Sequence, residues 1–251
     1  MKTAVPRTRR REVLLDLFLI FVFAAGLIRP LFKARYLDKW ASIESTFIAD
    51  ARFLLAHWPH PQWQPLWYAG TRFDYVYPPM LRYGTAAIAK VTGYWPVKAY
   101  HVYTAIFYCV GIAGVYLLVR VGMRSRGAAW LAAVATALMS PSLLFLKEFR
   151  ADAWHLLPVR LGVLAKYGEG PHMTSLALIP FALAFTWLAL ERRRPAAVGI
   201  AAVFCAAVVS NNFYGATALA VFYPVLVWSF WITRQDKRIL APAVVIPALA
   251  Y

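Results

Sequence analysis

Residues 102–119 read VYTAIFYCVGIAGVYLLV, an unbroken apolar stretch without a single charged side chain. An α-helix rises about 1.5 Å per residue, so a helix of this length would be about 27 Å long. That length approaches the thickness of the hydrocarbon core of a bilayer, about 30 Å. The stretch therefore predicts a membrane-spanning helix.

Six further stretches of the same kind occupy much of the remaining chain. They cover residues 13–28, 128–146, 174–190, 196–209 and 213–233, and the last begins near Ile239 and is still apolar at Tyr251. Of the 251 residues, 61% are hydrophobic and 15% are charged, whereas a soluble domain carries about 25% charged residues. The sequence therefore predicts an all-α fold, a polytopic transmembrane helical bundle of about seven helices.

The two ends of the chain bear on its domain organisation. The last apolar stretch reaches Tyr251 without a polar flank, so we expect residues 1–251 to form a single transmembrane domain. This domain would be the N-terminal part of a longer protein or a natural truncation. The first stretch follows several arginines, as in a signal peptide, but Arg29 and Pro30 come after it where a small-residue cleavage site would be needed. We therefore expect a retained first helix.

Basic residues cluster at the N-terminus and in three short turns between the predicted helices. The clusters are 7–11, then Arg120, Arg124 and Arg126, then 192–194, then Arg234, Lys237 and Arg238. Short loops rich in Lys and Arg stay on the cytoplasmic side of a membrane, and all four clusters fall on one face of the predicted bundle. We therefore expect an integral protein of a bacterial-type plasma (inner) membrane with a cytoplasmic N-terminus.

Two long segments, residues 31–98 and 147–172, connect the predicted helices at the opposite, outer face. Long loops are usually functional or disordered, and the many Trp and Tyr residues of the first loop are typical of a membrane–water interface. Both loops carry more basic than acidic residues, against the positive-inside bias. An anionic partner such as a phosphate-bearing lipid headgroup would explain this excess. Ordinary snorkelling of interfacial cations is the alternative explanation.

The first outer loop predicts two short interfacial helices. The first covers residues 43–56, with Ile43, Phe47, Leu54 and Leu55 near one face and Glu44, Asp50 and Arg52 elsewhere. The proline-rich residues 57–67 predict an extended segment. A second helix starts within residues 75–83, with a proline near its first turn, and ends at Gly93.

Several other chemistries lack their signatures in this sequence. It has no phosphate-cradling glycine loop, zinc-ligand spacing or Ser-His-Asp arrangement. His57 and His60 are spaced like metal ligands, but prolines surround them and no third ligand is evident, so we expect interfacial histidines. Cys109 and Cys205 lie within predicted helices and are expected to be small buried hydrophobes. The net charge of +16 does not indicate nucleic-acid binding, because the basic residues are divided between two faces and no binding motif accompanies them.

A series of short motifs follows the predicted helices in order. A basic N-terminus and one helix precede a long loop with an early acidic residue. This loop contains Pro59 and Trp63, then residues 67–70 (WYAG) and 77–80 (YPPM). The later motifs are residues 167–172 (YGEGPH) and 178–180 (LIP). This order resembles the GT-C superfamily of membrane glycosyltransferases. It is most similar to the multi-spanning family labelled "6-pyruvoyl-tetrahydropterin synthase-related membrane domain", although nothing in the sequence suggests pterin chemistry. The resemblance covers nearly the whole chain.

The resemblance implies an enzyme that takes a sugar from a polyprenyl-phosphate-linked donor and passes it to a glycan, lipid or protein acceptor. A carboxylate would accept the proton of the acceptor hydroxyl as it attacks the sugar. In such families the carboxylate lies soon after the first helix, and Asp38, Glu44 and Asp50 compete for the role. We favour Glu44 from its spacing to the later motifs, with Asp50 as the alternative. The family usually has Asp followed by His, whereas Phe47 and Ile48 occupy that stretch here, so a divalent metal is not indicated.

The same resemblance implies that cationic side chains hold the phosphate of the lipid carrier and stabilise its developing charge. The candidates in the second outer loop are Arg150, Arg160, Lys166 and His172. Glu169 is a candidate second acid, and Tyr77 of the YPPM motif is a candidate substrate contact. Asn211 and Asn212 either bind substrate or form a turn before Gly215.

Two other classes of function compete with a transferase. A transporter or lipid flippase also needs polar groups near helix ends. Against this class, the predicted spans carry few charges, whereas a coupled transporter usually carries some, and paired broken helices in repeated halves are not evident. A non-catalytic GT-C-like membrane protein is the second alternative. Acidic and basic residues in both outer loops favour an active site over a decayed one.

Overall fold

The computed structural model describes residues 7–33, 42–67, 69–140, 145–152 and 158–251. Within these ranges the fold is almost entirely helical, and the only sheet found there is a short hairpin, so the predicted fold class is confirmed at this level. Three helices are long and apolar enough to cross a membrane: α5 (Pro96–Met123), α10 (Gly170–Arg192) and α12 (Phe213–Arg234). The number of helices that cross a membrane stays a prediction.

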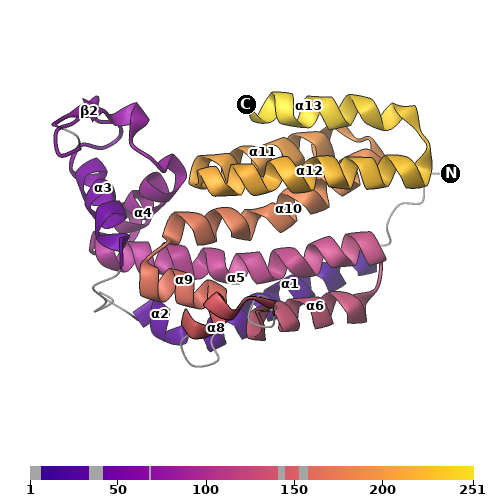
Figure 1. Ribbon diagram of the computed structural model, residues 1–251, viewed down its shortest axis with the longest axis horizontal. Helices are drawn as coiled ribbons and strands as arrows, with labels where there is room; N and C mark the ends of the chain where they lie inside the picture. The colour runs from indigo at the N-terminus through magenta and orange to yellow at the C-terminus, as the bar shows by residue number, and fades with distance from the viewer. Residues whose placement is uncertain (1–6, 34–41, 68, 141–144, 153–157) are drawn as a thin grey trace.

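Every predicted apolar stretch contains a helix of the bundle in Figure 1. Besides α5, α10 and α12, the bundle has α1 (Arg7–Leu27), α6 (Arg126–Leu138), α11 (Pro195–Asn211) and α13 (Leu240–Ala250). A short α2 (Arg29–Lys33) follows α1, and a 3-10 turn, η2 (Lys237–Ile239), precedes α13.

The third stretch, predicted over residues 128–146, is helical over a shorter range than expected. Its helix α6 ends at Leu138, and a separate short helix, α8 (Lys147–Asp152), follows later in the chain. The sequence has Pro141 shortly after Leu138. A proline lacks the N–H that a continuing helix needs and disfavours helical backbone in the residue before it, which favours a helix end at this point.

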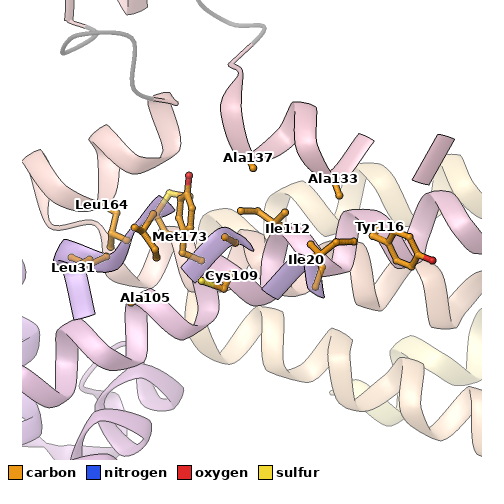
Figure 2. Close-up of a cluster of buried hydrophobic side chains, with 14 of the residues drawn as sticks. Ile20, Leu31, Ala105, Cys109, Ile112, Tyr116, Ala133, Ala137, Leu164 and Met173 are labelled. Carbon is orange, nitrogen blue, oxygen red and sulfur yellow. The ribbon is translucent and has the colours of Figure 1, made fainter. Parts of the chain in front are cut away.

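Helix α5 lies at the centre of the bundle and packs against α1, α6 and α10. Figure 2 shows part of this core, where Ile20 of α1 and Ala133 of α6 lie beside Cys109 and Ile112 of α5. Small residues let α5 and α10 approach closely: a Cβ on Gly111 would be 2.9 Å from the Cα of Ala177. Cys109 and Cys205 are buried free thiols, as predicted.

Ion pairs hold the basic turns together at one end of the bundle, here called the basic end. Glu191 at the end of α10 pairs with Arg124 after α5 and, at 3.8 Å, with Arg234 of α12. Arg193 pairs with Asp236 in the next turn. The prediction that these turns share one end is therefore confirmed, whereas the side of the membrane that they face stays a prediction.

The N-terminal helix joins this end through a buried carboxylate that sequence reasoning missed. Asp16 of α1 is fully buried and accepts a hydrogen bond from Tyr116 of α5 at 2.5 Å. Its two oxygens also accept bonds of 2.7 and 2.9 Å from Arg126 of α6. An acidic residue inside an apolar helix needs such partners, because an unpaired buried charge is costly. A lone Asp in the apolar residues 13–28 was the available signal.

The segment predicted as the first outer loop forms a compact unit at the opposite end of the bundle, here called the loop end (Figure 1). It consists of α3 (Glu44–Ala56), β1 (Trp63–Gln64), β2 (Thr71–Arg72), the 3-10 turn η1 (Phe73–Tyr75) and α4 (Pro79–Thr92). Both predicted helices are confirmed, including the proline in the first turn of α4 and its end at Gly93. The segment predicted as extended contains β1, which pairs antiparallel with β2.

One feature of the first short helix was predicted wrongly. Glu44 and Asp50 do not lie away from the apolar face of α3; both are buried and 1% exposed. Residues three or four positions apart lie on the same face of a helix. The successive separations between Glu44, Phe47, Asp50 and Leu54 are three, three and four residues, so these four side chains share one face. Helices α4 and α5 pack against α3 and cover this face.

Candidate functional site

The predicted base Glu44 is the first residue of α3, at the loop end, and its carboxylate points to α5. Its Oε2 lies 3.2 Å from Nε2 of His101, which is also 1% exposed. Each partner would be costly to bury alone, and the pair keeps both polar groups within hydrogen-bonding distance. The histidine beside Glu44 therefore comes from a helix 57 positions further along the chain.

A tight turn from the second outer loop lies directly over Glu44. It follows α9 (Val159–Tyr167), and its Gly168 has a left-handed backbone with φ of 71°. The carbonyl of Tyr167 accepts a 2.9 Å bond from the Ile43 N–H, and the carbonyl of Gly168 accepts a 2.8 Å bond from the Tyr100 hydroxyl. A Cβ on Gly168 would be 2.7 Å from the Glu44 nitrogen. The two outer loops thus meet at the candidate base.

Three predicted substrate contacts gather beside this turn, at the N-termini of α10 and α12. His172 Nδ1 lies 3.4 Å from Glu169 Oε2, and the imidazole stacks on the ring of Tyr214 with centroids 4.7 Å apart. The hydroxyl of Tyr77 accepts a 2.9 Å bond from the Phe213 N–H. Burial raises the pKa of Tyr77, and the Glu169 charge nearby adds to this. Glu169, His172 and Tyr77 are partly exposed, so this group is accessible from outside the bundle.

Asp50, the alternative base, lies in a separate buried group within the first loop. Its Oδ1 accepts bonds from Gln64 at 3.2 Å and Trp67 at 3.1 Å, while Oδ2 has no hydrogen-bond partner. Burial raises its pKa, and the bonds from Trp67 and Gln64 oppose that shift. Arg82 is buried nearby, 4.0 Å above the ring of Phe73. Because its two donors come from the β1 region, Asp50 connects α3 to the hairpin segment.

The structure does not bring the three predicted phosphate-binding cations to a common point. Arg150 is exposed on α8. Arg160 donates to the Thr136 carbonyl of α6 and lies 5.1 Å from the ring of Tyr108, and burial lowers its pKa. The ammonium of Lys166 lies 5.0 Å from the ring of Tyr167. Arg160 therefore ties α9 to the bundle, and the other two have different surroundings.

The remaining candidates have separate positions. Asp38 lies outside the described residues. Asn212 caps α12 by accepting a 2.6 Å bond from the Tyr214 N–H, as expected of a turn residue. Asn211 is fully buried, and its Oδ1 accepts a 3.1 Å bond from the Thr174 hydroxyl of α10. In the described ranges no group of three or more His, Cys, Asp or Glu side chains is placed to hold a metal ion.

Sequence reasoning missed His101, which α5 brings within 3.2 Å of Glu44, and Arg82, whose positive charge α4 brings near Asp50. His101 immediately precedes the apolar stretch 102–119, and a lone polar residue there was the available signal. Arg82 was counted only as part of the cation excess of the loop. Neither residue lies close in sequence to the carboxylate that it accompanies, so no local pattern could pair them.

Comparison of the chain with protein-family models, with curated proteins and with solved structures finds no match.

Proposed function

We propose that this protein is an integral membrane glycosyltransferase of GT-C type that moves a sugar from a polyprenyl-phosphate-linked donor to an acceptor. The observation that carries the proposal is the buried pair of Glu44 and His101, 3.2 Å apart, where the two outer loops meet. A carboxylate held by an imidazole is suited to take the proton of an attacking hydroxyl. The order of sequence motifs that resembles the GT-C superfamily supports the same reaction.

Glu44 acts as the general base in this proposal, and His101 is a positioning residue that orients its carboxylate. Because both are 1% exposed, an acceptor hydroxyl reaches Glu44 when the turn at Gly168 moves aside. The accessible group of Glu169, His172 and Tyr77 then lies next to the opened site and contacts the sugar. Closure of the turn would exclude water from the reacting centre, which protects the donor from hydrolysis.

The donor phosphate binds to the second outer loop in this proposal. Arg150 is exposed on α8 and can rearrange toward a lipid headgroup, and Lys166 lies one helix further along. Cationic donors are required there, because negative charge develops on the leaving phosphate as the sugar departs. Arg160 is held by Thr136 and Tyr108 and anchors α9.

The proposed orientation places the basic end in the cytoplasm and the loop end outside a bacterial-type inner membrane. The shared end of the Lys- and Arg-rich turns supports it, because such turns resist translocation. The transfer reaction would then take place at the outer face, where a lipid-linked donor is presented.

The test measures release of polyprenyl phosphate by the purified chain in lipid nanodiscs, supplied with polyprenyl-phosphate hexoses and pentoses as donors and with glycan, lipid and peptide acceptors whose hydroxyls can take the sugar. Glu44→Gln keeps the volume and a hydrogen-bonding group but removes the proton acceptor. General-base catalysis contributes about 10²–10⁴-fold, so we expect the variant to lose at least about two orders of magnitude in rate. Asp50→Asn is the matched control and should lose far less.

Three results would contradict the proposal in different ways. If Asp50→Asn abolishes release while Glu44→Gln remains active, Asp50 is the base. If both variants are as active as the parent, the carboxylate mechanism is wrong. If the folded parent releases no polyprenyl phosphate from any donor, the transferase proposal fails, and a transporter or non-catalytic membrane protein takes its place.

A further inference from the structure

The hairpin of the first loop borders an open hollow whose lining includes neither Glu44 nor His101. The hollow has a volume of about 520 Å³ and is lined by His60, Gln62, Trp63, Arg72 and Asp74. Ligand pockets in proteins are commonly about 300–1,000 Å³. The lining combines one large aromatic ring with several hydrogen-bonding side chains, a composition that differs from the apolar surface of the bundle.

Trp63 forms the aromatic wall and is 54% exposed. Its indole lies against Gly70, where an added Cβ would be 2.5 Å from the ring. Gly70 also has a φ of 112°, a backbone conformation that side chains rarely adopt. Glycine at this position therefore lets the indole lie directly on the main chain. Large exposed aromatic surface held in this way costs little conformational entropy on binding, so it is suited to stack on a ligand.

The polar wall is a network centred on Asp74. Its Oδ1 lies 3.0 Å from Nε2 of His60, and its Oδ2 accepts a 3.0 Å bond from Arg72. The side chains of His60 and Asp74 are each 45% exposed, and that of Arg72 is 63% exposed. A carboxylate oxygen has more than one acceptor site and a guanidinium has five donors, so the network can bind further hydroxyl groups without being broken.

These features select a ligand with an apolar face and a rim of hydroxyls, which is the chemistry of a sugar ring. The charges of Arg72 and Asp74 offset each other, which favours a neutral sugar over an anionic one. The hairpin also lies beyond the bundle, near the far end of α3 in Figure 1. Gln64 of the hairpin contacts Asp50, six residues or about 9 Å of helix from Glu44, so we expect a ligand that reaches both the hollow and Glu44 to contain more than one sugar ring.

We propose that this hollow binds the acceptor of the transfer reaction, a neutral oligosaccharide whose sugar ring stacks on Trp63 while its hydroxyls contact Asp74 and Arg72. The assignment as the acceptor site rests on the proposed function, whereas sugar binding by the hollow does not. The hollow would hold the acceptor chain at a distance from the reacting end, which raises the effective concentration of that end near Glu44.

The test is ligand-observed saturation-transfer NMR with the whole chain in nanodiscs and no donor present. Maltotriose, mannotriose, chitotriose and arabinotriose are the probes, each at millimolar concentration. We expect at least one to bind, and Trp63→Ala to weaken that binding by about tenfold or more, because it removes the stacking surface. Trp63→Phe should retain part of the affinity. Trp95→Ala removes an 80% exposed tryptophan outside the hollow and should leave binding unchanged.

The outcomes separate this proposal from the preceding one. Glu44→Gln should bind the trisaccharide as the parent does, even though it is expected to lose transfer. Binding with no transfer by the parent would contradict the proposed reaction and leave the sugar site in place. Binding that Trp63→Ala and Asp74→Asn leave unchanged, while the circular dichroism spectra of both match the parent, would overturn the sugar site. So would failure of all four trisaccharides to bind the folded parent.

Discussion

Replacing Gly168 by alanine tests whether the second outer loop is held onto the candidate base as the structure indicates. Gly168 ends α9 with φ of 71°, and a left-handed alanine costs roughly 1–2 kcal/mol. Its Cβ would also be 2.2 Å from the Ser42 hydroxyl, 2.7 Å from the Glu44 nitrogen and 3.0 Å from the Glu44 Cβ. The hydroxyl can rotate away, but the Glu44 nitrogen belongs to the main chain and the Glu44 Cβ is bonded directly to it. Overpacking of this kind typically costs about 1–3 kcal/mol. The expected loss in free energy of unfolding is therefore about 2–5 kcal/mol.

Gly93→Ala is a closely matched control. Gly93 ends α4 with the same φ of 71°, but nothing lies within 4 Å of an added Cβ. It should lose only the roughly 1–2 kcal/mol of the left-handed conformation. The measurement is reversible unfolding in mixed detergent micelles, together with hydrogen exchange at the Ile43 amide, which donates to the Tyr167 carbonyl. Faster exchange there is expected in Gly168→Ala and not in Gly93→Ala. Equal losses in the two variants, with unchanged Ile43 exchange, would refute the contact between the loops.

Two further predictions concern Asp50 and the orientation of the chain. Burial raises the native pKa of Asp50 above its ordinary value of 3.8, so the native state binds this proton more tightly than the unfolded chain does. Protonated Asp50 therefore stabilises the fold fully below pH 3.8, and this stabilisation is lost as the pH rises through the native pKa. Thermal unfolding from pH 4 to pH 7 should show a smaller loss of stability in Asp50→Asn than in the parent, and identical slopes would contradict the shift. Cysteines placed at Arg193 and Trp63 should react with an impermeant maleimide from opposite sides of the membrane, because the positions lie at the basic end and in the loop-end unit; labelling of both from one side would be inconsistent with this orientation. Cys109 and Cys205 are buried and should give little background.

The helices were largely predictable because each depends on a local pattern. A continuous apolar run such as 102–119 has no stable alternative to a helix in a membrane, since every backbone polar group must be satisfied within the segment. The end of α4 was equally predictable, because Gly93 readily adopts the left-handed backbone found there. The end of α6 was predicted wrongly, because the apolar run continues past Pro141 to residue 146 and hydropathy alone does not show where a helix ends.

The candidate site was predictable only in part. Glu44 was selected by its spacing to later motifs, but its burial depended on α4 and α5, which lie more than 30 residues further along the chain. Glu169 and His172 are three residues apart on one chain segment, so their contact follows from local geometry. Tyr77 and Tyr214, which lie beside them, are 95 and 42 residues from His172 in the sequence, and no spacing rule covers such separations. The contacts of Arg160 with Thr136 and Tyr108 also join distant segments, so spacing could not predict them.

The sequence by itself determined which segments are helical and apolar, where basic turns occur, and which polar and aromatic residues the two long loops carry. Composition and short-range periodicity control these properties, because hydrogen bonds within a helix and transfer into an apolar phase depend on neighbouring residues. The tertiary structure alone decided that His101 accompanies Glu44, that Arg126 accompanies Asp16, and that Trp63 and Asp74 face one hollow. A buried polar group needs a hydrogen-bond partner once the helices have packed. That partner can come from any segment that packing brings within hydrogen-bond distance, so its position in the sequence does not identify it.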